Sequence, residues 1–183
     1  MLAQRQARGT FFVVGQNVAS NPGMLRAEVA AGHEIGNHTW SHRDLTRLTP
    51  AEIKDQIDRT DQVIKAATGH RPSFVRPPYG AFNQTVRANV DRPLVLWAVD
   101  PRDWEHHDSA YVATQVINTV KPGDVVLMHD IHATTVDAVP RILDTLASRG
   151  YRFVTVSQLF SPRELTTDDT WSYNPDAYGR PNG

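Results

Sequence analysis

The amino-acid sequence predicts a parallel α/β fold, either an open doubly wound sheet or a barrel. Short runs of β-branched and aromatic residues alternate along the chain with amphipathic helical stretches. Several apolar runs are nearly continuous, as in strands that are covered on both faces. The chain has 183 residues, a length that suits one domain with a single sizeable core.

In the first half of the chain, helix caps and glycines mark the expected boundaries. The segment Thr49-Pro50-Ala51-Glu52 has the pattern of a capping box with proline at the first helical position, and Gly69 ends the helix that follows. Asn21-Pro22 begins an earlier helix in the same way, and Gly15 closes the first strand. We expect strands at 10–14 and 33–36, and helices at 22–31 and 50–68.

In the second half, prolines and glycines again separate the elements. Asn83 and Ser109 each begin a helix, and Pro122-Gly123 ends the second of them. Pro140 lies inside the last long helix, where it predicts a kink. We expect strands at 73–76, 94–99, 124–128 and 151–156, helices at 84–90, 109–121 and 134–149, and a closing turn at 157–160. The polar segment 161–183 is predicted to be a loosely ordered tail.

Composition excludes several classes of function. The net charge is −1 with no long run of one sign, so we expect no nucleic-acid partner. The chain has no cysteine, which rules out disulfides, thiolate metal ligands and a cysteine nucleophile. No apolar run approaches the ~20 residues of a membrane span. The first eight residues are too short and too polar for a secretory signal. No protein partner is indicated.

Two histidines, His38 and His42, form the most informative pair in the chain. They are four residues apart, just after a short apolar segment and among small polar residues. Neutral imidazoles are favoured ligands of zinc and its first-row neighbours. A pair with this spacing can bind one ion from a helix turn or from a tight loop. Taken alone, the pair is more simply explained as two surface histidines near a turn.

The reactive side chains of the sequence all follow predicted strands. These residues are His38, Arg76, Asp100, Asp103 and His129. The carboxyl ends of parallel strands meet at one edge of a sheet or one rim of a barrel, where both architectures build their active sites. Such a shared placement favours a functional site over five unrelated surface positions.

His129 and Asp103 suggest acid–base chemistry. A lone histidine at the end of a buried strand is more often structural, and an acid after a strand, such as Asp100 or Asp103, serves as a helix cap about as often as in a site. If Asp103 lies next to His129, however, the carboxylate favours the protonated imidazole. The two residues would then form a proton donor.

The sequence resembles a known family, the NodB-homology polysaccharide deacetylases of carbohydrate esterase family 4. The resemblance covers roughly residues 9–160, and its motifs occur in the family's order and spacing. The matching segments are Thr-Phe-Phe-Val-Val-Gly15, Gly-His-Glu-Ile-Gly-Asn-His-Thr-Trp-Ser-His42, Arg-Pro-Pro-Tyr-Gly80, Asp-Pro-Arg-Asp-Trp104 and Leu-Met-His-Asp130. The resemblance implies a deacetylase domain over 1–160 with an irregular (β/α) barrel of the NodB-homology type, followed by the tail at 161–183.

The resemblance also implies a metal site. His38 and His42 would bind a divalent metal, most simply zinc, with cobalt, nickel or manganese as alternatives. Arg76 would hold the carboxylate that acts as general base. The backbone N–H of Tyr79 would help to stabilise the oxyanion, an interaction typically worth ~3 kcal/mol.

The remaining implied roles concern proton transfer and substrate. Asp103 would tune His129, which would protonate the leaving amine or alcohol. Trp104 and Leu127 would wall the small pocket for the acetyl methyl group. The implied substrate is an acetylated polysaccharide or oligosaccharide of the chitin, peptidoglycan or xylan type. Members of the family usually act outside the cell or at its envelope, so a secreted or envelope location is expected.

The printed sequence departs from the family in one respect. The family's first motif, Thr-Phe-Asp-Asp-Gly-Pro, is not found, and that motif supplies the general base and the third metal ligand. The expected fold therefore misses its first strand and most of its first helix, and activity is expected to be impaired. Three explanations remain open: the chain begins late, it is a catalytically silent carbohydrate-binding homologue, or Asp130 or Asp100 replaces the missing aspartates. A different metallohydrolase on a similar barrel is a further, weaker alternative.

Overall fold

A computed structural model of the chain describes residues 1–161 and 170–172. By the packing of the backbone, the described chain divides into two compact units. The larger unit comprises Gly9–Leu96, 155–161 and Thr170–Trp171, and the smaller unit comprises Met1–Arg8, Trp97–Val154 and Ser172. Each unit is described by itself.

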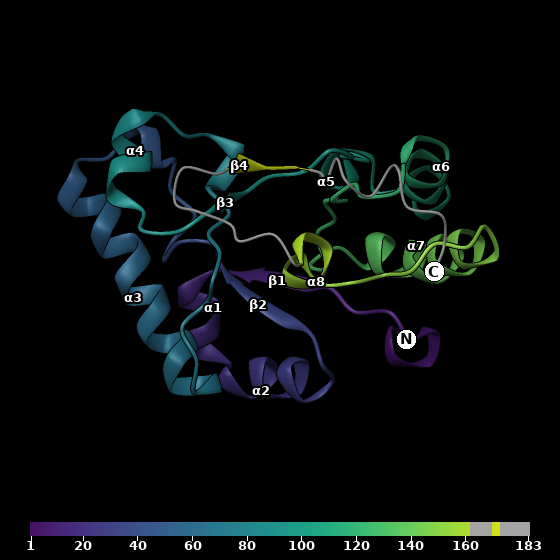
Figure 1. The fold of residues 1–183 in the computed structure, drawn as a ribbon, viewed down its shortest axis with the longest axis horizontal. Helices are drawn as coiled ribbons and strands as arrows, with labels where there is room; N and C mark the ends of the chain where they lie inside the picture. Colours follow the sequence, from purple (N-terminus) through teal and green to yellow (C-terminus); the bar gives the residue numbers. More distant parts are fainter. Residues whose placement is uncertain (162–169, 173–183) are drawn as a thin grey trace. The chain divides into compact units, whose positions relative to one another are not determined.

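A parallel sheet forms the centre of the larger unit (Figure 1). Strand β1 (Thr10–Val13) pairs in parallel with β2 (Glu34–Asn37). Val75 then bridges Asn37 on one side and Leu94 on the other, both in parallel. Strand β3 (Leu94–Val95) pairs with β4 (Thr170–Trp171), again in parallel. The predicted parallel α/β arrangement is confirmed in this unit.

Helices cover this sheet with buried apolar side chains. The helices are α1 (Gly15–Ser20), α2 (Pro22–Ala30), α3 (Pro50–Thr68), α4 (Gln84–Asn89) and α8 (Val156–Phe160), with short 3₁₀ turns at Leu45–Arg47 and Pro78–Gly80. One core cluster gathers apolar residues of α3, α4 and β3 around the fully buried Leu45, Ile53 and Val75. A second lies between α1, α2, β2 and α3 and includes Val18, Leu25 and Ile64.

Helix α3 confirms the local prediction in detail. The Thr49 hydroxyl accepts a hydrogen bond from the Glu52 N–H, and the Glu52 carboxylate accepts one from the Thr49 N–H at 2.9 Å. Both halves of the capping box are therefore formed. At the other end, Gly69 has a φ of 82° and its N–H donates to the Lys65 carbonyl, a left-handed cap that glycine adopts without strain.

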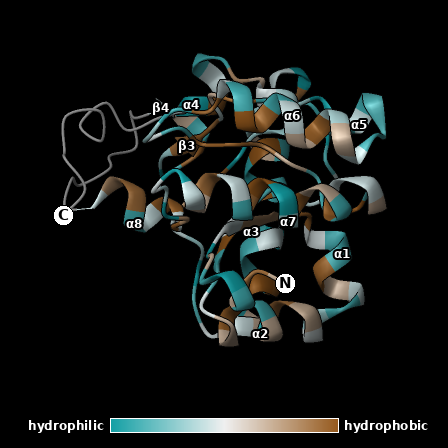
Figure 2. Ribbon diagram, turned by 90° about the vertical axis from the view of Figure 1, so that its right-hand side faces the viewer, coloured by the Kyte–Doolittle hydropathy of each residue, from teal (hydrophilic) through white to brown (hydrophobic). Residues whose placement is uncertain are grey.

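In the smaller unit, two amphipathic helices pack against each other. They are α6 (Ser109–Thr119) and α7 (Ala133–Ser148), and they follow the short α5 (Asp103–His106). Their shared core contains Val112, Val116 and Ile142. Figure 2 shows the brown hydrophobic residues of both helices interrupted by hydrophilic teal ones. The helix predicted at 134–149 is confirmed, and it continues through Pro140.

Regular strand structure is shorter than predicted. The predicted strand 73–76 is reduced to the bridge at Val75, and the predicted strand 94–99 to β3 with a second bridge between Val99 and Val126. Of the predicted strand 124–128, only Asp124 and Val126 remain as bridging residues. Prolines, which donate no backbone hydrogen bond, flank the Val75 segment and interrupt the ladder there.

The structure differs from the prediction at two further segments, 151–156 and the residues from Gly15 onward. The predicted strand 151–156 is not a strand, and Val156 instead begins α8 behind a capping box formed by Thr155 and Gln158. The first strand ends before Gly15, but Gly15 also begins α1, a helix that the sequence analysis did not predict. A Cβ on Gly15 would lie only 2.6 Å from Thr60 and from Trp40, so glycine is required there by close packing.

The predicted tail, 161–183, lies mostly outside the described residues. Within it, Thr170–Trp171 forms β4. None of the described helices combines the length and the apolar character needed to cross a bilayer.

Replacing Thr49 with alanine tests the capping box of α3. We expect Thr49→Ala to lower the free energy of unfolding by about 1 kcal/mol, because the Glu52 N–H loses its acceptor. Thr49→Ser keeps the hydroxyl and should stay close to wild type. Urea denaturation followed by circular dichroism measures both variants, and equal losses in the two would contradict the assignment.

Candidate active site

His38 and His42 lie in a tight loop directly after β2 rather than on a helix turn. The loop is held by short-range bonds: Asn37 Oδ1 accepts from the Thr39 N–H at 2.8 Å, and Thr39 Oγ1 accepts from the His42 N–H at 3.1 Å. Thr39 and His42 have φ values of 68° and 56°, which L-residues adopt only at a cost. The two imidazole ring centroids are 4.8 Å apart, with the rings at 75°.

One backbone contact fixes the tautomer of His38. Its Nδ1 lies 2.6 Å from the carbonyl oxygen of Arg76. A carbonyl only accepts hydrogen bonds, so Nδ1 carries a proton. Metal-binding histidines in proteins are commonly oriented by such a bond from their other ring nitrogen. In the neutral imidazole, this contact selects the tautomer whose Nε2 carries the lone pair.

The donor set fits a first-row divalent ion as two of its ligands. The neutral nitrogen donors and their mutual contact suit zinc, cobalt or nickel. Catalytic zinc sites typically use three protein ligands, and among residues 1–161 and 170–172 no group of three His, Cys, Asp or Glu side chains is placed to hold a metal. The described residues thus bring two imidazoles together without a third candidate ligand.

Residues of helix α3 hold the histidine loop through hydrogen bonds. Gln56 Oε1 accepts hydrogen bonds from the N–H groups of Trp40 and Ser41, at 3.1 Å and 3.0 Å. The Asn37 side chain donates to the Ile57 carbonyl at 3.0 Å and to Asp61 at 2.7 Å. These contacts determine where the loop that carries His38 and His42 leaves the sheet.

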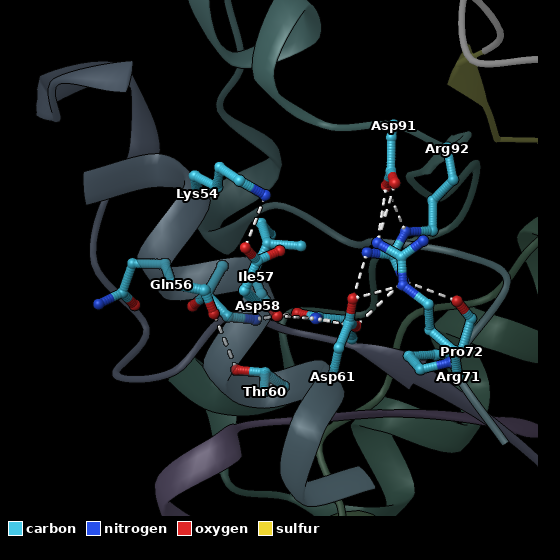
Figure 3. Close-up of polar contacts among 12 residues, drawn as sticks. Lys54, Gln56, Ile57, Asp58, Thr60, Asp61, Arg71, Pro72, Asp91 and Arg92 are labelled. Carbon is cyan, nitrogen blue, oxygen red and sulfur yellow. Dashed lines mark hydrogen bonds and ion pairs between the residues drawn. The ribbon is translucent and has the colours of Figure 1, made fainter. Parts of the chain in front are cut away.

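A buried ion network continues from Asn37 into the core of the larger unit. Asp61 and Arg92 are only 7% and 6% exposed, and Arg92 donates to both carboxylate oxygens of Asp61. Arg71 donates to Asp61 at 2.9 Å and also pairs with Asp91. Figure 3 shows the Asp61 carboxylate facing the two guanidinium groups, with Asp91 on their other side. The Asp61 charge is therefore fully compensated by donors.

Arg76 lies at the base of the same loop. It is 8% exposed, and its guanidinium stacks on the Phe12 ring at 4.1 Å and donates to the carbonyls of Val95 and Leu96, each at 3.1 Å. Burial lowers the pKa of Arg76 to about 10, so the group remains charged at neutral pH. Its implied role of holding the general base stays a prediction.

Tyr79 lies beside His42. The two rings are 4.9 Å apart, and Tyr79 has a φ of 60° within the Pro78–Gly80 turn. Its side chain also lines a cavity of about 410 Å³ together with Arg43, Asp44, Arg47 and Leu48. The implied role of the Tyr79 N–H as an oxyanion donor stays a prediction.

In the smaller unit, Asp103 and His129 are in direct contact. Asp103 begins α5 and is fully buried, and its Oδ1 lies 2.8 Å from His129 Nδ1. The Asp103 Oδ2 accepts from the His129 N–H at 2.6 Å and from the Thr135 hydroxyl at 2.8 Å. The contact that the sequence suggested is therefore present.

These donors set the charge state of Asp103. Burial by itself would raise the pKa of the carboxyl, but the hydrogen bonds from the His129 side chain, the His129 N–H and Thr135 outweigh it and hold the pKa below its ordinary value. Asp103 is therefore ionised at neutral pH. An ionised partner at Nδ1 leaves Nε2 as the nitrogen of His129 that can release a proton.

The other predicted residues of the smaller unit are Trp104, Leu127 and Asp100. Trp104 is 47% exposed, with the Arg102 guanidinium 5.5 Å from its ring, whereas Leu127 is buried. Asp100 accepts from the Arg102 N–H at 2.8 Å, a local turn of the kind that a capping acid makes. The pocket-lining roles implied for Trp104 and Leu127 stay predictions.

The structure thus describes the predicted site as two groups, each within its own unit. His38, His42, Arg76 and Tyr79 belong to the larger unit, and Asp103, His129, Trp104 and Leu127 to the smaller one. Sequence reasoning missed the polar side chains that support both groups. Asn37 stands inside the quoted motif and could have been noticed there, whereas Gln56, Asp61 and Thr135 have no signal in the sequence.

Comparison with known proteins places the chain in a family. A family model described as polysaccharide deacetylase matches residues 1–92. The chain belongs to the polysaccharide deacetylase family, and its α/β fold is the NodB-type fold of that family.

Individual relatives agree with this assignment. The peptidoglycan-N-acetylglucosamine deacetylase of Listeria monocytogenes is 38% identical over 162 residues, which is 88% of this chain and 35% of that protein. The chain therefore spans about a third of the length of this relative. A structure of a T48 deacetylase with substrate has a TM-score of 0.91 at 40% identity, covering 93% of this chain and 86% of that one. A family 4 acetyl xylan esterase from Clostridium thermocellum, in complex with a cobalt ion, has a TM-score of 0.89 at 35% identity, covering 95% and 89%.

Removal of the Asp61 charge tests the ion network. We expect Asp61→Asn to lower the free energy of unfolding by about 3–5 kcal/mol, because the buried Arg92 loses its compensating charge. Asp58→Asn is a matched control on the same helix, where the exposed ion pair with Lys54 contributes at most about 0.5 kcal/mol. Urea denaturation measures both, and a loss at Asp61 no larger than at Asp58 would refute the structural role.

The lowered pKa of Asp103 predicts how its contribution to stability depends on pH. The folded-state pKa lies below the unfolded value of about 3.9, so the contribution is complete above that pH and is lost as the pH falls through the folded-state pKa. We therefore expect the difference in unfolding free energy between wild type and Asp103→Asn to be largest near pH 7 and to shrink below about pH 4. Denaturant titrations at several pH values measure this, and a difference that grows on acidification would contradict it.

Proposed function

We propose that the chain is a metal-dependent hydrolase that removes acetyl groups from N- or O-acetylated polysaccharides. The observation that carries the proposal is the imidazole pair of His38 and His42, with His38 fixed in its ligand tautomer by the Arg76 carbonyl. This pair occurs in a member of the polysaccharide deacetylase family. A divalent ion bound there would polarise the acetyl carbonyl and supply a nucleophilic water near neutral pH.

In this proposal the histidine loop and the segment 76–80 bind the metal and orient the acetyl group. His38 and His42 hold the ion through neutral imidazole nitrogens. The Tyr79 N–H donates to the oxygen that becomes negative when the acetyl carbonyl is attacked. Arg76, buried and charged, would fix the carboxylate that removes the proton from water. In the family the first motif supplies this carboxylate, and that motif is not found in the printed sequence. The resemblance of the Arg-Pro-Pro-Tyr-Gly80 segment to the family motif supports these two roles.

His129 is proposed to supply the proton for the leaving group. His129, protonated at both nitrogens, donates the Nε2 proton to the leaving amine nitrogen or alkoxide oxygen as the C–N or C–O bond breaks. The Asp103 carboxylate accepts from Nδ1 throughout, stabilises the imidazolium and remains ionised. Trp104 and Leu127 are proposed to enclose the acetyl methyl group.

The proposed substrate class follows from the relatives, which are named for peptidoglycan N-acetylglucosamine and for acetyl xylan. We propose an acetylated polymer or oligomer of this kind, and zinc or cobalt as the metal. Because such polymers are extracellular, the proposal includes action outside the cell or at its envelope.

Metal removal and two classes of variant test this function together. Acetate release from chitooligosaccharides and acetylxylan is measured after chelation and after zinc or cobalt is restored. Because the family's first motif is not found in the printed sequence, we expect acetate release to be low, to disappear on chelation and to return with metal. We expect His42→Ala to weaken metal binding at least about tenfold in calorimetry. The matched change His70→Ala, at an exposed histidine of the same unit, should not affect binding.

A third variant separates chemistry from metal binding. His129→Ala should retain the metal affinity of wild type while acetate release falls about 10²–10⁴-fold, because the leaving group loses its proton donor. Binding of the glycan without any acetate release from metal-loaded wild type would instead identify a catalytically silent carbohydrate-binding protein. Equal metal affinity in wild type and His42→Ala would overturn the metal site.

A further inference from the structure

Thr135 makes a contact that the proposed chemistry does not yet use. Its hydroxyl donates to Asp103 Oδ2 at 2.8 Å, across 32 residues of sequence. The same oxygen accepts from the His129 N–H at 2.6 Å, while Oδ1 faces His129 Nδ1. Three donors therefore surround one fully buried carboxylate. Two of them belong to His129, and only Thr135 is independent of it.

The helix start fixes the position of this hydroxyl. Thr135 is the third residue of α7 and is 1% exposed, and its N–H donates to the His132 carbonyl at 3.0 Å. The N-terminal turn of a helix favours negative charge nearby. Through Thr135, the N-terminal turn of the 16-residue helix α7 therefore contacts the Asp103 carboxylate.

Four other helical threonines use their hydroxyls differently from Thr135. Their hydroxyls donate to a carbonyl four residues earlier in the same helix, as threonine commonly does. These residues are Thr60, Thr68, Thr114 and Thr119. The Thr135 hydroxyl instead donates to the Asp103 side chain, which belongs to α5. The helix α7 does not need this bond for its own stability.

We infer that Thr135 is a positioning residue for the proton donor, holding the Asp103 carboxylate in the orientation and ionised state that His129 needs. The inference rests on the proposed function, since Asp103 and His129 form a proton donor only within it. Without the Thr135 hydroxyl, Oδ2 keeps a single donor, and the terminal torsion of an aspartate is broad. The carboxylate is then less well fixed against Nδ1, and its negative charge is less stabilised.

The test compares Thr135→Val, which has nearly the same shape but no hydroxyl, with Thr135→Ser, which keeps it. Thr134→Val is the matched control on the same turn of α7. The ¹³C signal of the Asp103 carboxyl is titrated by NMR, and the ¹H signal of His129 Nδ1–H is followed in the same samples. We expect Thr135→Val to raise the proton affinity of Asp103 about tenfold, since a hydrogen bond to its charged form is lost.

The accompanying signals complete the expected result. In Thr135→Val the Nδ1–H signal of His129 should exchange faster with solvent, whereas Thr135→Ser and Thr134→Val should match wild type in both measurements. An unchanged Asp103 titration in Thr135→Val overturns the inference. So does an equal shift in Thr134→Val, which would show a general disturbance of α7.

Wild type alone decides the matter if Thr135→Val does not fold. The Thr135 hydroxyl proton must then exchange slowly, and Asp103 must titrate below the ordinary aspartate value. Rapid exchange or an ordinary titration overturns the inference. None of these measurements needs turnover, so an absence of acetate release counts against the proposed function, and an unshifted titration counts against the role of Thr135.

Discussion

The buried charge of Asp61 is the interaction on which the larger unit depends. It joins three parts of the chain that are distant in sequence: helix α3, the end of β2 through Asn37, and the segment before β3 through Arg92. An ionised carboxylate cannot be buried without such partners. Each donor to Asp61 therefore also fixes a backbone position, and the loop that carries His38 and His42 leaves the sheet from one of those positions. Core packing and site geometry in this unit share a single electrostatic requirement.

Helices were predictable from the sequence to the extent that local interactions determine them. The Thr49–Glu52 capping box, the Gly69 cap and the apolar faces of α6 and α7 all involve residues within a few positions of one another. Strands depend on partners elsewhere in the chain. Residues 73–76 and 124–128 have the composition of strands, yet the structure keeps only Val75 of the first and Asp124 and Val126 of the second as bridging residues. Only the partner backbone decides how many ladder bonds form.

The residues of the candidate site likewise divide into those that local sequence patterns revealed and those that depend on distant partners. The histidine pair, the arginine before two prolines, and Asp103 with His129 were visible because their residue types and their positions after strands are informative together. Gln56 and Thr135 were not, because each is an ordinary residue of an ordinary helix until the fold brings it to Trp40 or to Asp103. A supporting hydrogen bond is a property of two distant positions, and a pattern within one segment contains no record of it.

The left-handed backbone of the histidine loop has an evolutionary consequence. Thr39, His42 and Tyr79 occupy a region of φ that glycine enters without penalty and that costs other residues about 1–2 kcal/mol each. Selection for thermal tolerance alone would favour glycine at these places, and at position 42 that replacement would delete an imidazole. At position 42 the backbone and the proposed metal site therefore make opposite demands on the side chain.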